Sequence, residues 1–235
     1  MCFNQKYSAA FALMGTVALA LVWKNKKLGH NLLFVPLIFY TIMELLQTVQ
    51  YSYVNSCNKV NRFLTEISYL LVVVQPIMWN LIFLFKKRSV RLTDVQRGIL
   101  ICAVTLCGVW IVAHFLRRFN FYGKNLSKEN ESLSEITSGP KTCTFKKEDE
   151  HLYWTYEIFS NPGMDANWFM YLVLWFIPGF MIPGERSTVL FLLAGFLASW
   201  AYVKINNHTR HITPSLWCLT SAPTLALNVA YALMF

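Results

Sequence analysis

The sequence predicts an all-α integral membrane protein, a bundle of seven transmembrane helices that forms a single domain over residues 1–235. Two observations support this prediction. The chain is 55% hydrophobic and 16% aromatic but only 14% charged, whereas soluble domains usually contain about 25% charged residues. In addition, residues 62–85 form an almost continuous apolar run that ends against Lys86, Lys87 and Arg88. That run is long enough to cross a bilayer, because about 20 helical residues span the hydrocarbon core.

Similar apolar runs place the helices at about residues 6–23, 31–53, 62–85, 98–116, 167–182, 187–205 and 213–235. Residues 117–165, between the fourth and fifth helices, contain two Asn-x-Ser sequons, a Gly-Pro pair and a charged run, so they predict one long loop. Within this loop residues 151–159 are rich in aromatic side chains. We expect them to form either a short strand or an aromatic segment at the membrane surface.

The first apolar run has two interpretations. Ala18-Leu19-Ala20 resembles the cleavage site of a signal peptide. A retained helix is favoured, because the run continues to Trp23 and then meets a group of lysines. With the first helix retained and the N-terminus outside, these lysines and the basic cluster after the third helix lie in the cytoplasm, as the positive-inside rule prefers.

This orientation makes the long loop external, together with the loops after the second and sixth helices. The sequon asparagines Asn125, Asn130 and Asn207 then lie outside, where they could carry glycans. Cys57 and Cys143 lie in two external loops and either form a disulfide or remain free thiols. A protein with these features is expected in the plasma membrane or a secretory-pathway membrane of a eukaryotic cell.

Polar side chains inside the second apolar run indicate a functional site. Tyr40, Glu44, Gln47 and Tyr51 recur every three or four residues, so they share one face of a helix. A carboxylate near the bilayer centre costs several kcal/mol unless it is protonated, paired or hydrated, which makes Glu44 the most informative single residue. The competing interpretation is a neutral glutamic acid that is hydrogen-bonded to a neighbouring helix.

The third and seventh helices add further polar positions. The predicted cavity or ion-binding set is Glu44, Gln47, Tyr51, Glu66, Gln75, Asn80, Thr224 and Asn228. Glu66 is alternatively a solvated residue in the first turn of its helix. Pro76 predicts a kink, because it frees a backbone carbonyl one turn earlier. For the two asparagines, hydrogen bonds that join neighbouring helices are the competing interpretation.

These patterns favour a channel or transporter for protons or small cations, through a polar cavity between the second, third and seventh helices. A receptor-like or small-ligand-binding membrane protein without transport is the alternative. A membrane-embedded metal hydrolase that uses His114, His208 and His211 is a third hypothesis. Enzymes are the less favoured class, because the sequence contains no Gly-x-Ser-x-Gly, phosphate-binding glycine loop or Cys-x-x-Cys motif.

No cofactor is expected. Residues 213–235 contain no lysine, which excludes a retinal Schiff base at its usual position, and the motifs of seven-helix receptors and microbial rhodopsins are both missing. The formal charge of +9 does not indicate nucleic-acid binding, because the basic residues cluster at the ends of apolar runs. The expected partners are the lipid bilayer and a small cation or small-molecule ligand, and a homo-oligomer is an open alternative.

Overall fold

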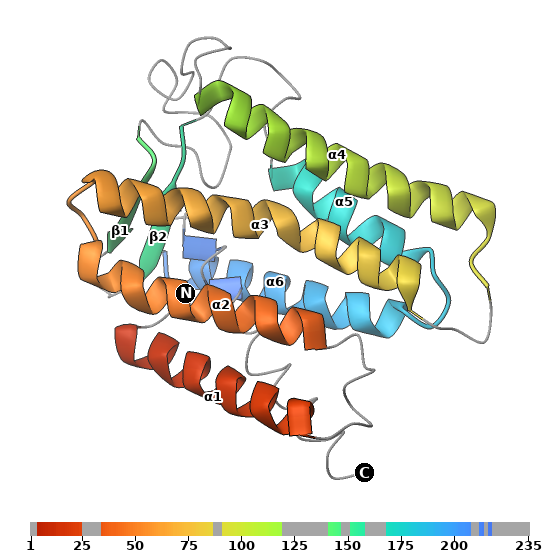
Figure 1. The fold of residues 1–235 in the computed structure, drawn as a ribbon, viewed down its shortest axis with the longest axis horizontal. Coiled ribbons are helices and arrows are strands. Elements are labelled where there is room, and N and C mark those ends of the chain that lie inside the picture. Colours follow the sequence, from red (N-terminus) through yellow and green to blue (C-terminus); the bar gives the residue numbers. More distant parts are fainter. Residues whose placement is uncertain are drawn as a thin grey trace. The chain divides into compact units, whose positions relative to one another are not determined.

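A computed structural model describes residues 4–24, 34–86, 91–118, 141–146, 151–157, 168–207, 212–213 and 216–217. Within these ranges the chain is mostly helical, as predicted (Figure 1). The elements are α1 (Gln5–Lys24), α2 (Phe34–Gln50), the 3-10 turn η1 (Tyr51–Tyr53), α3 (Lys59–Phe85), α4 (Asp94–Arg118), β1 (Cys143–Lys146), β2 (Leu152–Thr155), α5 (Trp168–Phe180) and α6 (Arg186–Ile205). The six helices lie where the first six spans were predicted. The predicted helix at 213–235 falls almost entirely outside the described residues.

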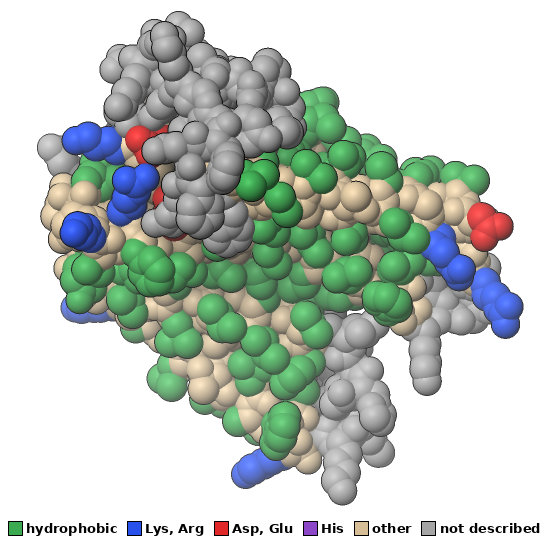
Figure 2. Space-filling view, turned by 45° about the horizontal axis from the view of Figure 1, so that its top comes forward, with side chains coloured by type: hydrophobic (Ala, Val, Ile, Leu, Met, Phe, Trp, Pro, Cys, Tyr) green, Lys and Arg blue, Asp and Glu red, His purple; other side chains and the backbone are tan. Residues whose placement is uncertain are grey.

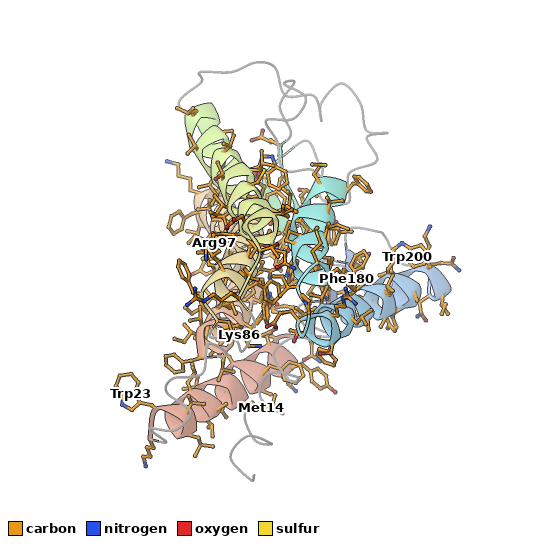
Figure 3. All side chains as sticks on the ribbon, turned by 90° about the vertical axis from the view of Figure 1, so that its right-hand side faces the viewer. Met14, Trp23, Lys86, Arg97, Phe180 and Trp200 are labelled. Atoms are coloured by element: carbon orange, nitrogen blue, oxygen red, sulfur yellow. A yellow bond between two sulfur atoms is a disulfide. The ribbon has the colours of Figure 1, made fainter. Side chains whose placement is uncertain are left out.

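Four of the described helices are long and apolar enough to cross a membrane by length and composition: Gln5–Lys24, Lys59–Phe85, Asp94–Ala113 within α4, and Arg186–Ile205. Hydrophobic side chains cover much of the described surface that is visible in Figure 2. Figure 3 shows the Trp23 ring projecting outward at the end of α1, where it is 79% exposed. Trp200 on α6 is 46% exposed. So large an apolar surface is typical of contact with lipid or with another protein, and seven spans remain a prediction.

Side-chain caps explain why two helices begin earlier than predicted. The Asn61 backbone N–H donates to Asn58 Oδ1 over 2.9 Å, so α3 begins before residue 62. At the start of α4, the Thr93 N–H donates to Gln96 Oε1 over 3.0 Å and the Gln96 N–H donates to Thr93 Oγ1 over 3.2 Å. This reciprocal capping box starts α4 before residue 98.

The chain divides into two compact units. The first comprises Met1–Ser68, Cys143–Trp154 and Ala194–Phe235, and the second comprises Tyr69–Thr142 and Thr155–Leu193. Helices α3 and α6 each contribute residues to both units. The two units are described separately below.

In the first unit α1 packs antiparallel to α2. Gln5 Nε2 donates to the Thr48 carbonyl over 3.1 Å, and Gly15, midway along α1, faces Thr41. A Cβ added at Gly15 would collide with Thr41 Oγ1 and lie only 3.1 Å from Thr41 Cβ. Glycine is therefore what permits this close approach of the two helices.

In the second unit α3 and α5 run parallel, and α4 runs antiparallel to α5. The Gln75 and Asn80 side chains on α3 bond to Tyr171 and Leu174 on α5, in the same order along both helices. At the opposite end of the pair, Gln96 Nε2 near the start of α4 donates to the Met181 carbonyl over 2.8 Å. The end of α3, the start of α4 and the α5–α6 connection therefore lie at one end of this unit.

A β-hairpin lies within the segment that was predicted as one exposed loop. Strands β1 and β2 pair in a two-stranded sheet, and the five residues 147–151 between them are too few for a parallel crossover, so the pair is antiparallel. The short-strand interpretation of residues 151–159 is confirmed by β2. The exposed-loop prediction is wrong for residues 143–146, which form β1 and where Cys143 is 0% exposed.

Candidate functional site

The polar face of α2 is buried within the first unit. Glu44 is 1% exposed, Gln47 is 0% exposed and Gln50 is 1% exposed, at successive three-residue intervals. The predicted stripe ran through Tyr51, but α2 ends at Gln50 and Tyr51 begins a 3-10 turn that leaves it half-buried. Sequence reasoning missed Gln50, although the regular spacing from Glu44 could have identified it.

Gln50 joins three elements through its amide group. Its Nε2 donates to Ser68 Oγ on α3 over 2.8 Å and to Thr144 Oγ1 on β1 over 3.1 Å. Its Oε1 accepts a hydrogen bond from Trp154 Nε1 on β2 over 3.3 Å. Both amide hydrogens are used and the oxygen has a donor, as a buried amide requires. We therefore interpret Gln50 as a structural link between the helices and the hairpin.

Asn61 on α3 pairs with the free edge of β1. Its Nδ2 donates to the Thr144 carbonyl over 2.8 Å and to the Tyr53 carbonyl over 2.6 Å, while its Oδ1 accepts from the Thr144 N–H over 2.8 Å. The hydroxyls of Thr65 and Thr144 lie 2.7 Å apart beside this pair. The asparagine amide thus hydrogen-bonds to Thr144 as a neighbouring strand would, which protects the strand edge.

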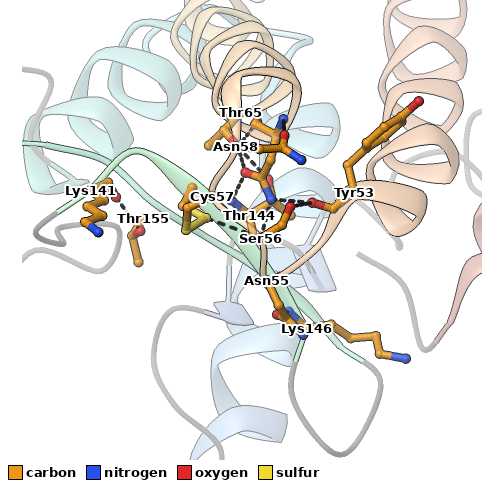
Figure 4. Close-up of a disulfide and its surroundings, with 12 residues drawn as sticks. Tyr53, Asn55, Ser56, Cys57, Asn58, Thr65, Lys141, Thr144, Lys146 and Thr155 are labelled. Atoms are coloured by element: carbon orange, nitrogen blue, oxygen red, sulfur yellow. Dashed lines mark hydrogen bonds between the residues drawn. A yellow bond between two sulfur atoms is a disulfide. The ribbon is translucent and has the colours of Figure 1, made fainter.

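A disulfide between Cys57 and Cys143 fixes the hairpin to the α2–α3 connection (Figure 4), with 5.3 Å between the Cα atoms. Of the two alternatives left open by the sequence, the structure shows the paired one. Asn55 and Cys57 adopt φ values of 66° and 42°, a left-handed conformation that non-glycine residues rarely adopt. Asn55 is held by its N–H bond to the Thr144 carbonyl at 3.2 Å and by the Lys146 N–H bond to its Oδ1 at 2.8 Å. The hairpin is therefore a tightly fixed cap on the ends of α2 and α3.

Glu66 is not the solvated first-turn residue that one interpretation predicted. It is 5% exposed, because α3 begins at Lys59 and Glu66 already lies beyond the first turn. Its Oε1 lies 3.7 Å from Arg62 Nε, and the Arg62 side chain is 53% exposed. The carboxylate is thus partly compensated by a surface arginine on the same helix face.

Gln75 and Asn80 are buried in the second unit, at 1% and 0% exposure. The Tyr171 hydroxyl donates to Gln75 Oε1. Asn80 Nδ2 donates to the Pro76 carbonyl over 2.7 Å and to the Leu174 carbonyl over 2.9 Å.

The bond from Asn80 to Leu174 has a clear structural reason. Leu174 precedes Pro178 by four residues within α5. Proline has no N–H, so the Leu174 carbonyl lacks the donor that an ordinary helix would provide. Asn80 supplies that donor from α3. Of the two interpretations of Asn80, its contacts support the interhelical hydrogen bond.

A buried carboxylate also lies at the end of the second unit where α3 stops. Lys86 Nζ lies 2.9 Å from Glu185 Oε1 and donates to Oε2 over 3.1 Å. The Glu185 side chain is 4% exposed and that of Lys86 is 45% exposed. The sequence predicted Lys86 only as a charge that orients the helix. Its partner could have been suspected from Pro183-Gly184-Glu185, a carboxylate in a tight turn between two apolar helices.

Several predicted positions lie outside the described residues: Thr224, Asn228, His208, His211, Asn125, Asn130 and the side chain of His114. Asn207 is described; it is exposed just after α6, with a φ of 52°. In the described part of the chain, no group of three or more His, Cys, Asp or Glu residues could hold a metal ion. The histidine hypothesis therefore remains untested.

Comparison with known proteins places the chain in a family. The model of a family of unknown function, DUF5765, matches residues 6–234. The chain belongs to this family. It is also 25% identical over 251 residues to the uncharacterized protein R287 of Acanthamoeba polyphaga mimivirus, a match that covers 98% of this chain and 95% of the viral protein. No solved structure matches the chain. Function therefore has to be argued from the geometry described above.

Proposed function

We propose that this DUF5765 protein is a multi-pass membrane protein that spans the bilayer seven times with its N-terminus outside. Contacts within the first unit support this topology. The Gln5–Thr48 bond places the start of α1 beside the end of α2, and the Asn55–Thr144 bond places the hairpin beside the α2–α3 connection. The start of α1 and the hairpin between α4 and α5 thus share one end of the unit, as alternating helix directions require.

On this architecture we infer transport of protons or small cations, with Glu44 as the central ionisable group. The observation that carries the proposal is the burial of this carboxylate at 1% exposure in α2, whose apolar sequence contains no Lys or Arg. Gln47, one turn further on, is also fully buried. A carboxylate and an amide on one helix face provide the oxygen atoms that a proton or a small cation requires, and an anion would find no basic partner on α2.

The hydrogen bonds of the buried polar side chains reduce the number of residues that we assign to the proposed path of the proton or cation. Gln50 uses both amide hydrogens and its oxygen to hold the hairpin, and Asn80 uses both amide hydrogens to join α3 to α5. Glu66 lies beside Arg62. The side chains that we propose for the path itself are Glu44 and Gln47 in the first unit.

The proposal is tested by flux measurements in proteoliposomes, first under a pH gradient and then under gradients of single alkali cations. Glu44→Gln keeps the shape of the side chain and removes its ionisable group. We expect flux to fall by about tenfold or more, which corresponds to roughly 1.4 kcal/mol in the barrier. Glu157→Gln is the matched control, because Glu157 follows β2 outside the helices.

Equal flux in wild type and in correctly folded Glu44→Gln would refute the role of Glu44. If neither protein conducts under any gradient, and reconstitution is verified, transport itself is refuted. The alternative of a ligand-binding membrane protein would then predict saturable thermal stabilisation by a small apolar or amphipathic molecule.

A further inference from the structure

Basic side chains gather at the end of the second unit where α3 stops and α4 and α6 start. Lys86 directly follows α3, Arg97 lies near the start of α4, and Arg186 is the first residue of α6. All three are exposed. The Gln96 side chain, next to Arg97, donates to the Met181 carbonyl, which joins the start of α4 to the α5–α6 connection. Figure 3 is viewed from this end and labels Lys86 and Arg97. The basic residues of three helices thus share one small region.

The Arg186 side chain is fixed in a position that leaves most of its guanidinium group free to bind a ligand. Its Nε donates to the Phe180 carbonyl over 3.1 Å, and this bond gives a partner to a carbonyl at the C-terminus of α5. No further hydrogen bond or ion pair joins the guanidinium to another described residue. Its two terminal nitrogens can therefore donate to the oxygen atoms of a phosphate group, which arginine binds through two parallel hydrogen bonds.

The charge of the two arginines at this end is not cancelled by nearby carboxylates. Within the described part of the chain, neither Arg97 nor Arg186 forms an ion pair, and the carboxylate of the α5–α6 turn is already paired with the lysine after α3. Asp94 is the other acidic residue here, and the exposed Arg91 three positions earlier supplies a compensating charge. An anionic ligand therefore fits this end of the unit better than a cation does.

Exposed hydrophobic side chains lie beside the basic residues. Phe85, at the end of α3, is 71% exposed. Val95 precedes Arg97 by two residues and is 67% exposed, and Leu190 follows Arg186 by about one helical turn and is 55% exposed. Basic groups next to exposed apolar side chains are typical of the boundary between the hydrocarbon core and the headgroup layer of a bilayer.

We propose that Arg97 and Arg186 form a binding surface for the headgroups of anionic membrane lipids such as phosphatidylserine. The arginines supply positive charge and hydrogen-bond donors for the phosphate, and the exposed hydrophobic side chains beside them contact the acyl chains. A free phosphate compound would use only the first of these two features. The inference rests on the proposed function for its membrane topology alone: with the N-terminus outside, this end faces the cytoplasmic leaflet, which carries anionic lipids.

The test is thermal unfolding of the full-length protein in detergent with added phosphatidylserine, compared with phosphatidylcholine, which has no net charge. We expect phosphatidylserine to raise the unfolding midpoint of the wild type more than phosphatidylcholine does. Loss of one basic group near a membrane surface weakens the attraction to anionic lipid about fivefold. Arg97→Gln and Arg186→Gln should therefore each need about five times as much phosphatidylserine for the same shift. Each variant is compared with its own midpoint in phosphatidylcholine, so a change in basal stability does not enter the comparison.

Two controls separate this surface from a general attraction of charges. Lys204→Gln is the matched variant, because Lys204 is an exposed basic residue near the opposite end of α6 and its loss lowers the net charge by the same amount. We expect its response to phosphatidylserine to equal that of the wild type. Inorganic phosphate and glycerophosphoserine, which is the headgroup without acyl chains, test whether the lipid itself is required. We expect neither to match the shift that phosphatidylserine produces.

Equal shifts with the two lipids in the wild type would overturn the proposed surface. So would an equally weakened response in Lys204→Gln and in the two arginine variants. Stabilisation by inorganic phosphate or glycerophosphoserine as strong as that by phosphatidylserine would overturn a lipid as the occupant. None of these measurements needs flux. If proteoliposomes show no flux while the arginine variants lose their response to phosphatidylserine, the proposed transport fails and the lipid surface stands.

Discussion

Gly15 provides the sharpest test of how α1 and α2 pack. Gly15→Ala places a methyl group against Thr41 Oγ1, and the Thr41 Cβ and Cγ2 atoms lie only 3.1 and 3.2 Å from it. Thr41 cannot easily turn away, because its hydroxyl donates to the Leu37 carbonyl over 2.7 Å and the residue is 5% exposed. Overpacking of this kind lowers the stability by about 1–3 kcal/mol. Alanine also has a higher helix propensity than glycine, which raises the stability by about 1 kcal/mol.

A matched control separates the steric clash with Thr41 from the effect of alanine's higher helix propensity. Gly108 lies within α4, and a Cβ added there would have no atom within 4 Å. Gly108→Ala therefore gains helix propensity without a clash. We expect Gly15→Ala to be less stable than Gly108→Ala by about 1–3 kcal/mol, the overpacking cost alone. The assay is reversible unfolding in detergent with increasing fractions of SDS, followed by circular dichroism.

A double-mutant cycle completes the argument. Thr41→Ala removes the Oγ1 and Cγ2 atoms that the new methyl group would meet. Gly15→Ala should therefore cost much less in the Thr41→Ala background, which gives a favourable coupling energy of about 1 kcal/mol or more between the two positions. Equal stability of Gly15→Ala and Gly108→Ala, or a coupling energy near zero, would refute the close approach of α1 and α2.

Three further predictions concern the hairpin. Cys57→Ser and Cys143→Ser should each destabilise the protein by about 2–4 kcal/mol, and the double variant should lose no more than either single variant because both break one bond; additive losses in thermal unfolding would contradict this. Asn61→Ala should lower the free energy of unfolding by about 1–3 kcal/mol, because it removes the hydrogen bonds to the backbone of β1. Asn58→Ala removes only a helix cap and should lower it by roughly 1 kcal/mol. Equal losses in the two variants would argue against the strand-like pairing. Burial raises the pKa of the Tyr153 phenol above its ordinary value of 10.0. The stability that this shift contributes is therefore complete below pH 10 and is lost as the pH rises further. In unfolding measurements at increasing pH, Tyr153→Phe should lose less stability above pH 10 than the wild type does.

The helices could be predicted from the sequence because hydropathy dominates where a chain meets lipid. The six described helices each coincide with a predicted apolar run. Their starts were misplaced where a short polar motif extends the helix beyond its apolar part, as Thr93 and Gln96 do for α4. The motif is present in the sequence, but helix bounds taken from apolar runs leave out the polar turn that precedes each run.

The hairpin was harder to foresee because long-range contacts create it. Only two of the residues 143–146 are hydrophobic, and they lie within a long hydrophilic segment, so no clear local pattern predicts a strand. The strand forms because Asn61, in α3, and Asn55, in the α2–α3 connection, hydrogen-bond along its open edge. Such pairing depends on residues more than eighty positions away, which no reading of periodicity reveals.

The predicted site illustrates a different limit. The sequence predicts the buried amides in apolar helices as one set of residues that line a polar cavity, yet in the structure their hydrogen-bond partners differ. Asn80 lies opposite the carbonyl that Pro178 leaves without a donor, and the proline and the asparagine are 98 residues apart in the sequence. A proline within a membrane helix creates a demand for a donor, and an amide on a neighbouring helix meets that demand. Glu44 differs from the amides because its carboxyl group can gain and lose a proton, which an amide does not do. That is why the transport proposal depends on Glu44 and not on the amides.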